Sequence, residues 1–72
     1  MTPDEFDRFH RRLSGAFPRM IPGAADQRTA QREAWYTALR HHDFDRALFS
    51  LARWTNDRRN PPSIHDIIDG IR

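Results

Sequence analysis

Three serines are the side chains of this chain that could act as nucleophiles: Ser14, Ser50 and Ser63. Hydrolysis or group transfer by a serine needs a general base beside the hydroxyl, and a further group that holds the base, in one cleft. No catalytic motif accompanies these serines, and each has a simpler role at a helix end or on the surface. Ser63 precedes an apolar helical stripe and is followed by Asp66, which is the pattern of a helix cap. The sequence therefore predicts no catalytic residues and a protein that is not an enzyme.

The four histidines raise the question of a metal site. Two histidines that bind one ion from a single helix are usually four residues apart, and no pair here has that spacing. His41 and His42 are adjacent, so their side chains should point about 100° apart around a helix of about 3.6 residues per turn. His10 and His42 fall on apolar faces, where a hydrogen-bonded structural histidine is the simpler interpretation. We expect no metal, no cofactor and no small-molecule substrate.

Arginines around Trp54 have the composition of a surface for single-stranded nucleic acid. Arg53 precedes the tryptophan, and Arg58 and Arg59 follow it one turn later. Such surfaces combine cations along the phosphates with aromatic rings on which bases stack, and they generally use several rings. Only one ring is available here, so Trp54 at the rim of the core, with arginines in solvent, is the competing interpretation. We expect at most weak, non-specific contact with DNA.

Two further aromatic residues are candidates for contact with a partner protein. Phe49 lies away from the apolar stripe of its predicted helix, so it should face solvent or pack under a loop. Tyr36 flanks the stripe of the preceding helix. Single exposed apolar residues also occur on ordinary surfaces, and one residue does not make a patch. The candidate partner-binding residues are Phe49, Tyr36, Trp54, Arg53, Arg58 and Arg59.

Composition limits the class of protein further. The 72 residues, of which 38% are hydrophobic, suffice for one small domain, residues 1–72, and no second core. The twelve arginines exceed the ten acidic residues by a net charge of only +2, which is too small to indicate nucleic-acid binding by itself. No cysteine is present, no apolar run approaches the roughly 20 residues that span a bilayer, and the N-terminus lacks a signal-peptide pattern. We expect a cytoplasmic protein without a membrane partner.

Four helices are predicted to position these side chains. Thr2-Pro3-Asp4-Glu5 is a helix-start signature, with a hydroxyl cap, a proline in the first turn and a glutamate at the capping-box position. Asp26 or Thr29 can cap the second helix and Asp43 the third. Apolar residues at helical spacing give the predicted inner faces: Phe6, Phe9, Leu13, Phe17, Trp35, Ala38, Leu39, Phe44, Ala47, Leu48, Leu51 and, at the end of the third helix, Thr55.

The last helix follows a rigid corner. Asn60 and the two prolines Pro61 and Pro62 stop the third helix, because proline lacks a backbone donor and restricts the residue before it. A short apolar stripe then begins: Ile64, Ile67, Ile68 and Ile71. No segment alternates with a period of two, so no strand is expected. The prediction is an all-α protein: a compact bundle of four helices, the last one short and following the Pro-Pro corner.

The order of these signals is similar to a known family. The matching segments are Thr2-Pro3-Asp4-Glu5-Phe6, Ala16-Phe17-Pro18, Glu33-Ala34-Trp35-Tyr36-Thr37-Ala38-Leu39, Asp43-Phe44-Asp45-Arg46-Ala47-Leu48 and Pro61-Pro62-Ser63-Ile64-His65-Asp66-Ile67. Together they span nearly the whole chain, and in this order they resemble the phage replicative-helicase loader and inhibitor family. Members of that family are small helical proteins that bind the hexameric helicase of phage replication.

The resemblance implies an all-helical N-terminal domain that brings a helicase onto an origin or holds it inactive, without catalysis. It also implies a flexible polar tail associated with helicase contact, whereas this sequence stops at Arg72; either the natural protein is longer, or helicase loading is in doubt. The function expected is that of a phage DNA-replication adaptor in the cytoplasm of a bacterial host. A nucleic-acid-binding module that uses the arginines and Trp54, and an inhibitor of another host protein, are the alternatives.

Overall fold

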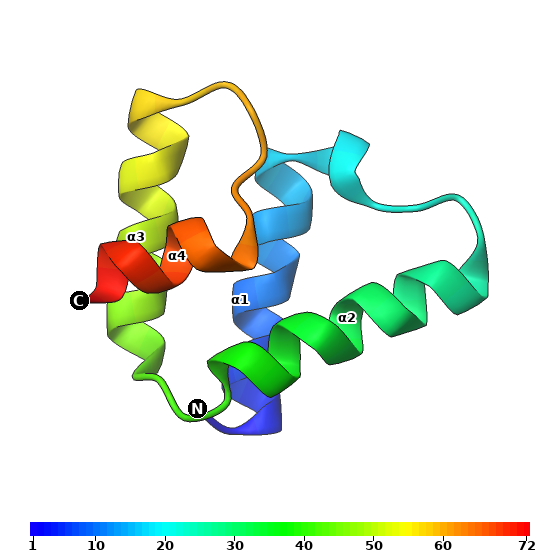
Figure 1. Cartoon of the computed structure of the whole chain (residues 1–72), viewed down its shortest axis with the longest axis horizontal. Helices are drawn as coiled ribbons and strands as arrows, with labels where there is room; N and C mark the ends of the chain where they lie inside the picture. The colour runs from blue at the N-terminus through cyan, green and yellow to red at the C-terminus, as the bar shows by residue number, and fades with distance from the viewer.

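The computed structural model describes all residues 1–72 and has four α-helices without a strand, as the sequence predicts. The last helix is short and follows the Pro-Pro corner. None of the helices has the length and apolar character needed to cross a lipid bilayer. Figure 1 shows the elements, which in chain order are α1 (Pro3–Ala16), the 3-10 turn η1 (Pro18–Met20), α2 (Ala25–Leu39), α3 (Phe44–Asp57) and α4 (Ile64–Ile71).

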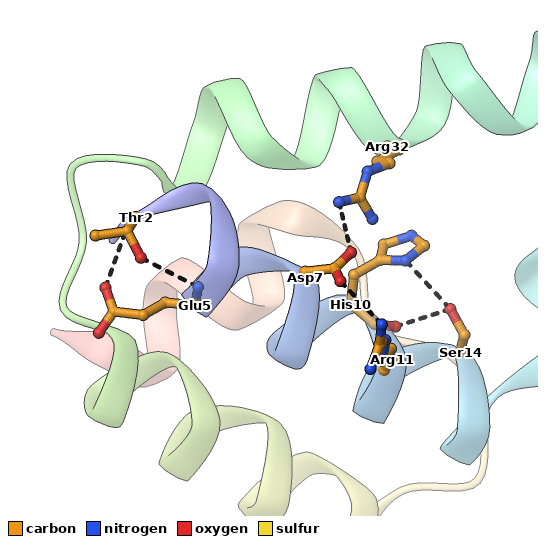
Figure 2. Close-up of polar contacts among 7 residues, drawn as sticks. All are labelled: Thr2, Glu5, Asp7, His10, Arg11, Ser14 and Arg32. Carbon is orange, nitrogen blue, oxygen red and sulfur yellow. Dashed lines mark hydrogen bonds and ion pairs between the residues drawn. The ribbon is translucent and has the colours of Figure 1, made fainter.

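Side-chain caps start three of the four helices where they are predicted. The hydroxyl of Thr2 accepts from the backbone N–H of Glu5 at 3.2 Å, and the Glu5 carboxylate accepts from the Thr2 N–H at 2.8 Å (Figure 2). Ser63 and Asp66 form the same reciprocal pair at the start of α4. The carboxylate of Asp43 caps α3. These caps satisfy backbone donors that a helix cannot satisfy internally, and they fix where each helix begins.

The predicted cap of α2 is wrong. The helix begins at Ala25, and Ala24 occupies the cap position without a side-chain hydrogen bond. Asp26 therefore lies inside the first turn, and Thr29 donates its hydroxyl proton to the carbonyl of Ala25 within the helix. Arg28 instead reaches back to the carbonyls of the preceding loop, including that of Gly23, and holds the loop against the helix start.

The core lies where α1 meets the other helices. Nine buried side chains form it: Phe6, Phe9, Leu13, Phe17, Trp35, Leu39, Ala47, Leu51 and Ile67. The ring centres of Phe9 and Trp35 are 6.2 Å apart, so α1 packs directly against α2 in this core. Thr55 is exposed, so its predicted place on the inner face of α3 is wrong. A hollow between α1 and α3 opens the interface at that level.

The N-terminal half of α2 projects from the rest of the domain (Figure 1). Residues 25–30 are exposed, whereas Trp35 and Leu39 in the second half are buried. The junction between the halves is polar: a guanidinium nitrogen of Arg32 lies 2.8 Å from the carboxylate of Asp7, and the amide of Gln31 donates to the carbonyl of Met20 at 3.0 Å. Apolar packing thus anchors the C-terminal half of α2, and hydrogen bonds and an ion pair at the junction anchor the projecting N-terminal half.

Candidate functional site

Four of the six predicted partner-binding residues lie along α3 and at its C-terminal end, where they form two pairs of an arginine and an aromatic ring. Phe49 is the one large hydrophobic side chain that is mainly exposed, at 63%. The guanidinium carbon of Arg53 lies 5.9 Å from the centre of the Phe49 ring, and that of Arg58 lies 5.0 Å from the Trp54 ring. Arg53 follows Phe49 by four residues within α3, which places both on one side of the helix, whereas Arg58 is the extended residue that ends α3. We call Phe49, Arg53, Trp54 and Arg58 the aromatic–arginine surface.

Trp54 fixes the position of this surface relative to the core. Its ring is half-buried against the core, and its indole N–H donates to the carbonyl of Asn60 at 2.6 Å. The ring thereby ties the end of α3 to the turn that leads into α4. Because the Arg58 guanidinium covers one side of the ring, Trp54 has little free face on which a base could stack.

A hollow of about 290 Å³ lies beside the contact between α3 and α4. Its charged side chains are balanced in number, and its lining is Ser50, Arg53, Trp54, Asp57, Arg58, Asp66, Asp69, Gly70 and Arg72. The hydrogen bonds from the backbone and hydroxyl of Ser63 lower the pKa of Asp66, because they favour the ionised carboxylate. The hollow therefore combines both signs of charge beside the half-buried ring of Trp54.

Sequence analysis missed the part of this hollow that α4 contributes. Asp66 and Asp69 are three positions apart in the sequence, so they fall on one side of a helix, but only the packing of α4 turns that side toward α3. The Nε2 atom of His65 lies 3.1 Å from the Asp69 carboxylate, one turn away on the same helix. The spacing of the two aspartates is the one signal that could have placed them together.

Tyr36 and Arg59 lie apart from the aromatic–arginine surface. The Tyr36 ring packs edge-on against Phe6, with 5.1 Å between ring centres, and lines a separate hollow between α1 and α2. Arg59 lines a third hollow at the end of α1, together with Arg19. Neither residue lines the hollow between α3 and α4, so the structure does not bring them into the aromatic–arginine surface.

The serines that could act as nucleophiles all have structural partners. Ser50 is buried and donates to the carbonyl of Ile67 at 2.8 Å, so its predicted place on the surface is wrong. Ser63 caps α4. Ser14 lies 3.5 Å from Nδ1 of His10, but its hydroxyl donates to the His10 carbonyl at 2.8 Å (Figure 2). Asp7, on the same side of α1, pairs with Arg11 and Arg32 and does not orient the imidazole.

His10 has a structural setting between α1 and the projecting half of α2. Burial lowers the pKa of His10, and the neighbouring charge of Arg32 lowers it further, while Asp7 acts in the opposite direction. The Phe6 ring centre lies 5.8 Å away. No three His, Cys, Asp or Glu side chains lie close enough together to hold a metal ion. His10 thus belongs to the packing of the helix pair.

Comparisons with protein families, with characterised proteins and with solved structures found no match to this chain. The residues and their arrangement are therefore the grounds on which a function can be proposed. The aromatic–arginine surface gives the strongest indication of a function. There the exposed ring of Phe49 lies under Arg53, and Arg53 also lines the hollow of mixed charge.

Proposed function

We propose that this domain is a non-enzymatic adaptor of phage DNA replication, which docks to a hexameric replicative helicase through the aromatic–arginine surface and loads or inhibits it. The order of the sequence motifs supports the helicase as partner. The exposure of Phe49 beneath Arg53 is the observation that supports this surface as the contact. Interfaces between proteins draw most of their binding energy from a few aromatic and arginine anchors. The adaptor would act in the cytoplasm of a bacterial host.

The charges beside the anchors favour a protein partner over a phosphate backbone. Asp57, Asp66 and Asp69 line the same hollow as Arg53 and Arg58. Phosphates would be repelled by these carboxylates, whereas a protein surface can present both signs of charge to match them. An interface of this kind gains specificity from the pattern of charges and affinity from the buried ring.

Calorimetric titration of the domain against the cognate phage helicase and the host helicase tests this proposal. We expect Phe49→Ala to weaken binding by about 2 kcal/mol, or roughly 30-fold, because it removes the exposed anchor. Arg53→Ala should also weaken binding. Arg40→Ala is the matched control, because Arg40 is an exposed arginine at the end of α2, outside the surface. ATPase and strand-loading assays then separate a loader from an inhibitor.

Two results would contradict different parts of the proposal. If the domain binds neither helicase and leaves the ATPase activity of both unchanged, the proposed function is wrong. If it binds a helicase but Phe49→Ala and Arg53→Ala bind as tightly as the parent, the adaptor function stands and the contact lies on another surface. Melting curves of each variant show whether weaker binding reflects lost contact or lost folding.

A nucleic-acid-binding module is the second candidate function. The observation that favours it is the pair of guanidinium groups over the rings of Phe49 and Trp54, which is the combination of cation and ring that contacts single strands. A nucleic acid would have to displace Arg58 to stack on Trp54 and would meet the aspartates of the hollow. A third candidate function is inhibition of another host protein, which would use the same anchors. This candidate would be favoured if the domain is folded but binds neither helicase.

A further inference from the structure

A groove with a different chemistry lies where α1 and α3 end. The two helices run in the same direction, so their C-terminal ends lie at the same end of the domain (Figure 1). A hollow of about 360 Å³ lies between them, lined by Arg12, Ala16, Leu48, Leu51, Ala52, Thr55 and Asn56. Ala16 also lines a neighbouring hollow of about 230 Å³, whose other residues are Phe17, Pro18, Arg19, Arg59 and Pro61. We call these two adjoining hollows the arginine groove.

All the charged side chains that line the arginine groove are positive. Arg12, Arg19 and Arg59 line it, and no aspartate or glutamate does. All three arginines are exposed, and none takes part in an ion pair, whereas Arg11 and Arg32 are paired with Asp7. A free guanidinium offers several donors in a planar fork that matches a carboxylate. The groove is therefore complementary to a row of acidic groups.

The floor of the groove is apolar and recessed. Leu48 is half-buried and Leu51 almost fully buried, and the small residues Ala16 and Ala52 leave space above them. A bound peptide gains binding free energy by burying its apolar side chains there, whereas a sugar-phosphate backbone has no apolar side chains to bury. The one aromatic side chain of the lining, Phe17, is buried, so no ring is available for base stacking. The groove therefore favours a peptide over a nucleic acid.

We propose that the arginine groove binds an acidic amphipathic helix of a partner protein. The apolar stripe of that helix lies over Leu48 and Ala52, and its carboxylates pair with Arg12, Arg19 and Arg59. This is the mode in which a helix binds a groove through residues spaced three and four apart. The proposal does not depend on the helicase assignment, because the groove contains no residue of the aromatic–arginine surface.

Nuclear magnetic resonance titration of the isotope-labelled domain tests the groove directly. The probe is a synthetic peptide of about 16 residues with leucines at helical spacing and glutamates at the positions that flank this apolar stripe. A scrambled peptide of the same composition keeps the charge and loses the stripe. We expect the patterned peptide to shift the backbone amides of Arg12, Ala16, Ala52 and Thr55 and to bind more tightly than the scrambled one. Equal binding of the two peptides, or shifts confined to other residues, would overturn the proposal.

Charge reversal separates this groove from general attraction to a basic protein. Arg12→Glu should weaken binding of the patterned peptide about tenfold or more, because it replaces an attraction with a repulsion at the contact. Arg40→Glu makes the same charge change outside the groove and should leave the affinity within about twofold at physiological salt. A titration with a single-stranded oligothymidine completes the test. Tighter binding of this oligonucleotide than of the peptide, lost in Arg12→Glu, would assign the groove to nucleic acid and refute the proposal.

Discussion

Ser50 on α3 and Gly70 on α4 lie so close together that no side chain fits at position 70. A β-carbon built on Gly70 would lie 3.1 Å from the β-carbon of Ser50 and would overlap its hydroxyl oxygen. The same hydroxyl donates to the carbonyl of Ile67, one turn earlier on α4. Close approach and this buried hydrogen bond together set the distance between α3 and α4, and with it the width of the hollow beside the aromatic–arginine surface.

Gly70→Ala should destabilise the domain for this reason. Overpacking at a close contact costs about 1–3 kcal/mol, which outweighs the roughly 1 kcal/mol by which alanine is the better helix former. Gly15→Ala is the matched control, because Gly15 lies in α1 with nothing near its missing side chain, and it should stabilise or leave stability unchanged. Urea denaturation of both variants measures the difference. Equal stability of Gly70→Ala and the parent would show that α4 can shift without cost.

Trp35→Ala should unfold much of the protein population. Trp35 is 4% exposed and packs against Phe9, so its removal leaves a cavity that costs about 3–5 kcal/mol. A domain of this size has a total stability of only about 5 kcal/mol or slightly more. Phe49→Ala removes an exposed ring and should change stability by only about 0.5 kcal/mol. A melting temperature for Trp35→Ala equal to that of the parent would refute the packing of α1 against α2.

Asp66 should make the stability of α4 depend on acid pH. Its pKa in the folded state is lowered from the ordinary value of 3.8 by the hydrogen bonds from Ser63. Its stabilising contribution is therefore complete above about pH 4 and is lost as the pH falls through the lower folded-state pKa. Asp66→Asn should reduce this dependence in acid titrations followed by circular dichroism. Ser63→Ala should also reduce it, at a cost near 1 kcal/mol at neutral pH. Identical acid unfolding of Asp66→Asn and the parent would contradict this role.

His10 should make the domain less stable as the pH falls below 6.5. Its folded-state pKa is lowered from that value, so the unfolded chain takes up the proton first, and stability declines until the pH passes the folded-state pKa. Arg28 and Arg32 of α2 and Asp7 of α1 are the charged groups around it. His10→Gln should remove this part of the pH dependence in denaturation series. A nuclear magnetic resonance titration that gave His10 a pKa above 6.5 would show the sign to be wrong.

Binding to single-stranded DNA should be weak and sensitive to salt. The net charge is +2, and the arginines of the aromatic–arginine surface lie beside aspartates, so few phosphates can be neutralised together. Fluorescence anisotropy with a labelled oligonucleotide at increasing salt measures this. A dissociation constant below about 1 μM at physiological salt, lost in the double variant Arg58→Ala and Arg59→Ala, would favour the nucleic-acid-binding function instead.

The sequence by itself determined the helices, most of their starts and most of the core. The caps at Thr2, Asp43 and Ser63, and the extended corner at Pro61 and Pro62 between α3 and α4, depend on groups within four residues of one another. Such local hydrogen bonds and proline restrictions act in the same way whatever the rest of the chain does. The helical spacing of the apolar residues likewise follows from the geometry of one helix. Only the cap of α2 was misplaced, because there Arg28 and the preceding loop take the place of a side-chain cap.

Tertiary structure alone decided how the helices lie against one another, and therefore what each surface contains. Periodicity puts Ser50 on α3 and Gly70 on α4, but their contact depends on the packing of every side chain between the two helices. The same packing turns the aspartates of α4 toward Arg53 and opens the groove beside Arg12. The angle at each corner and the fit of large and small side chains fix these distances, and neither is contained in the spacing of residues along a single helix.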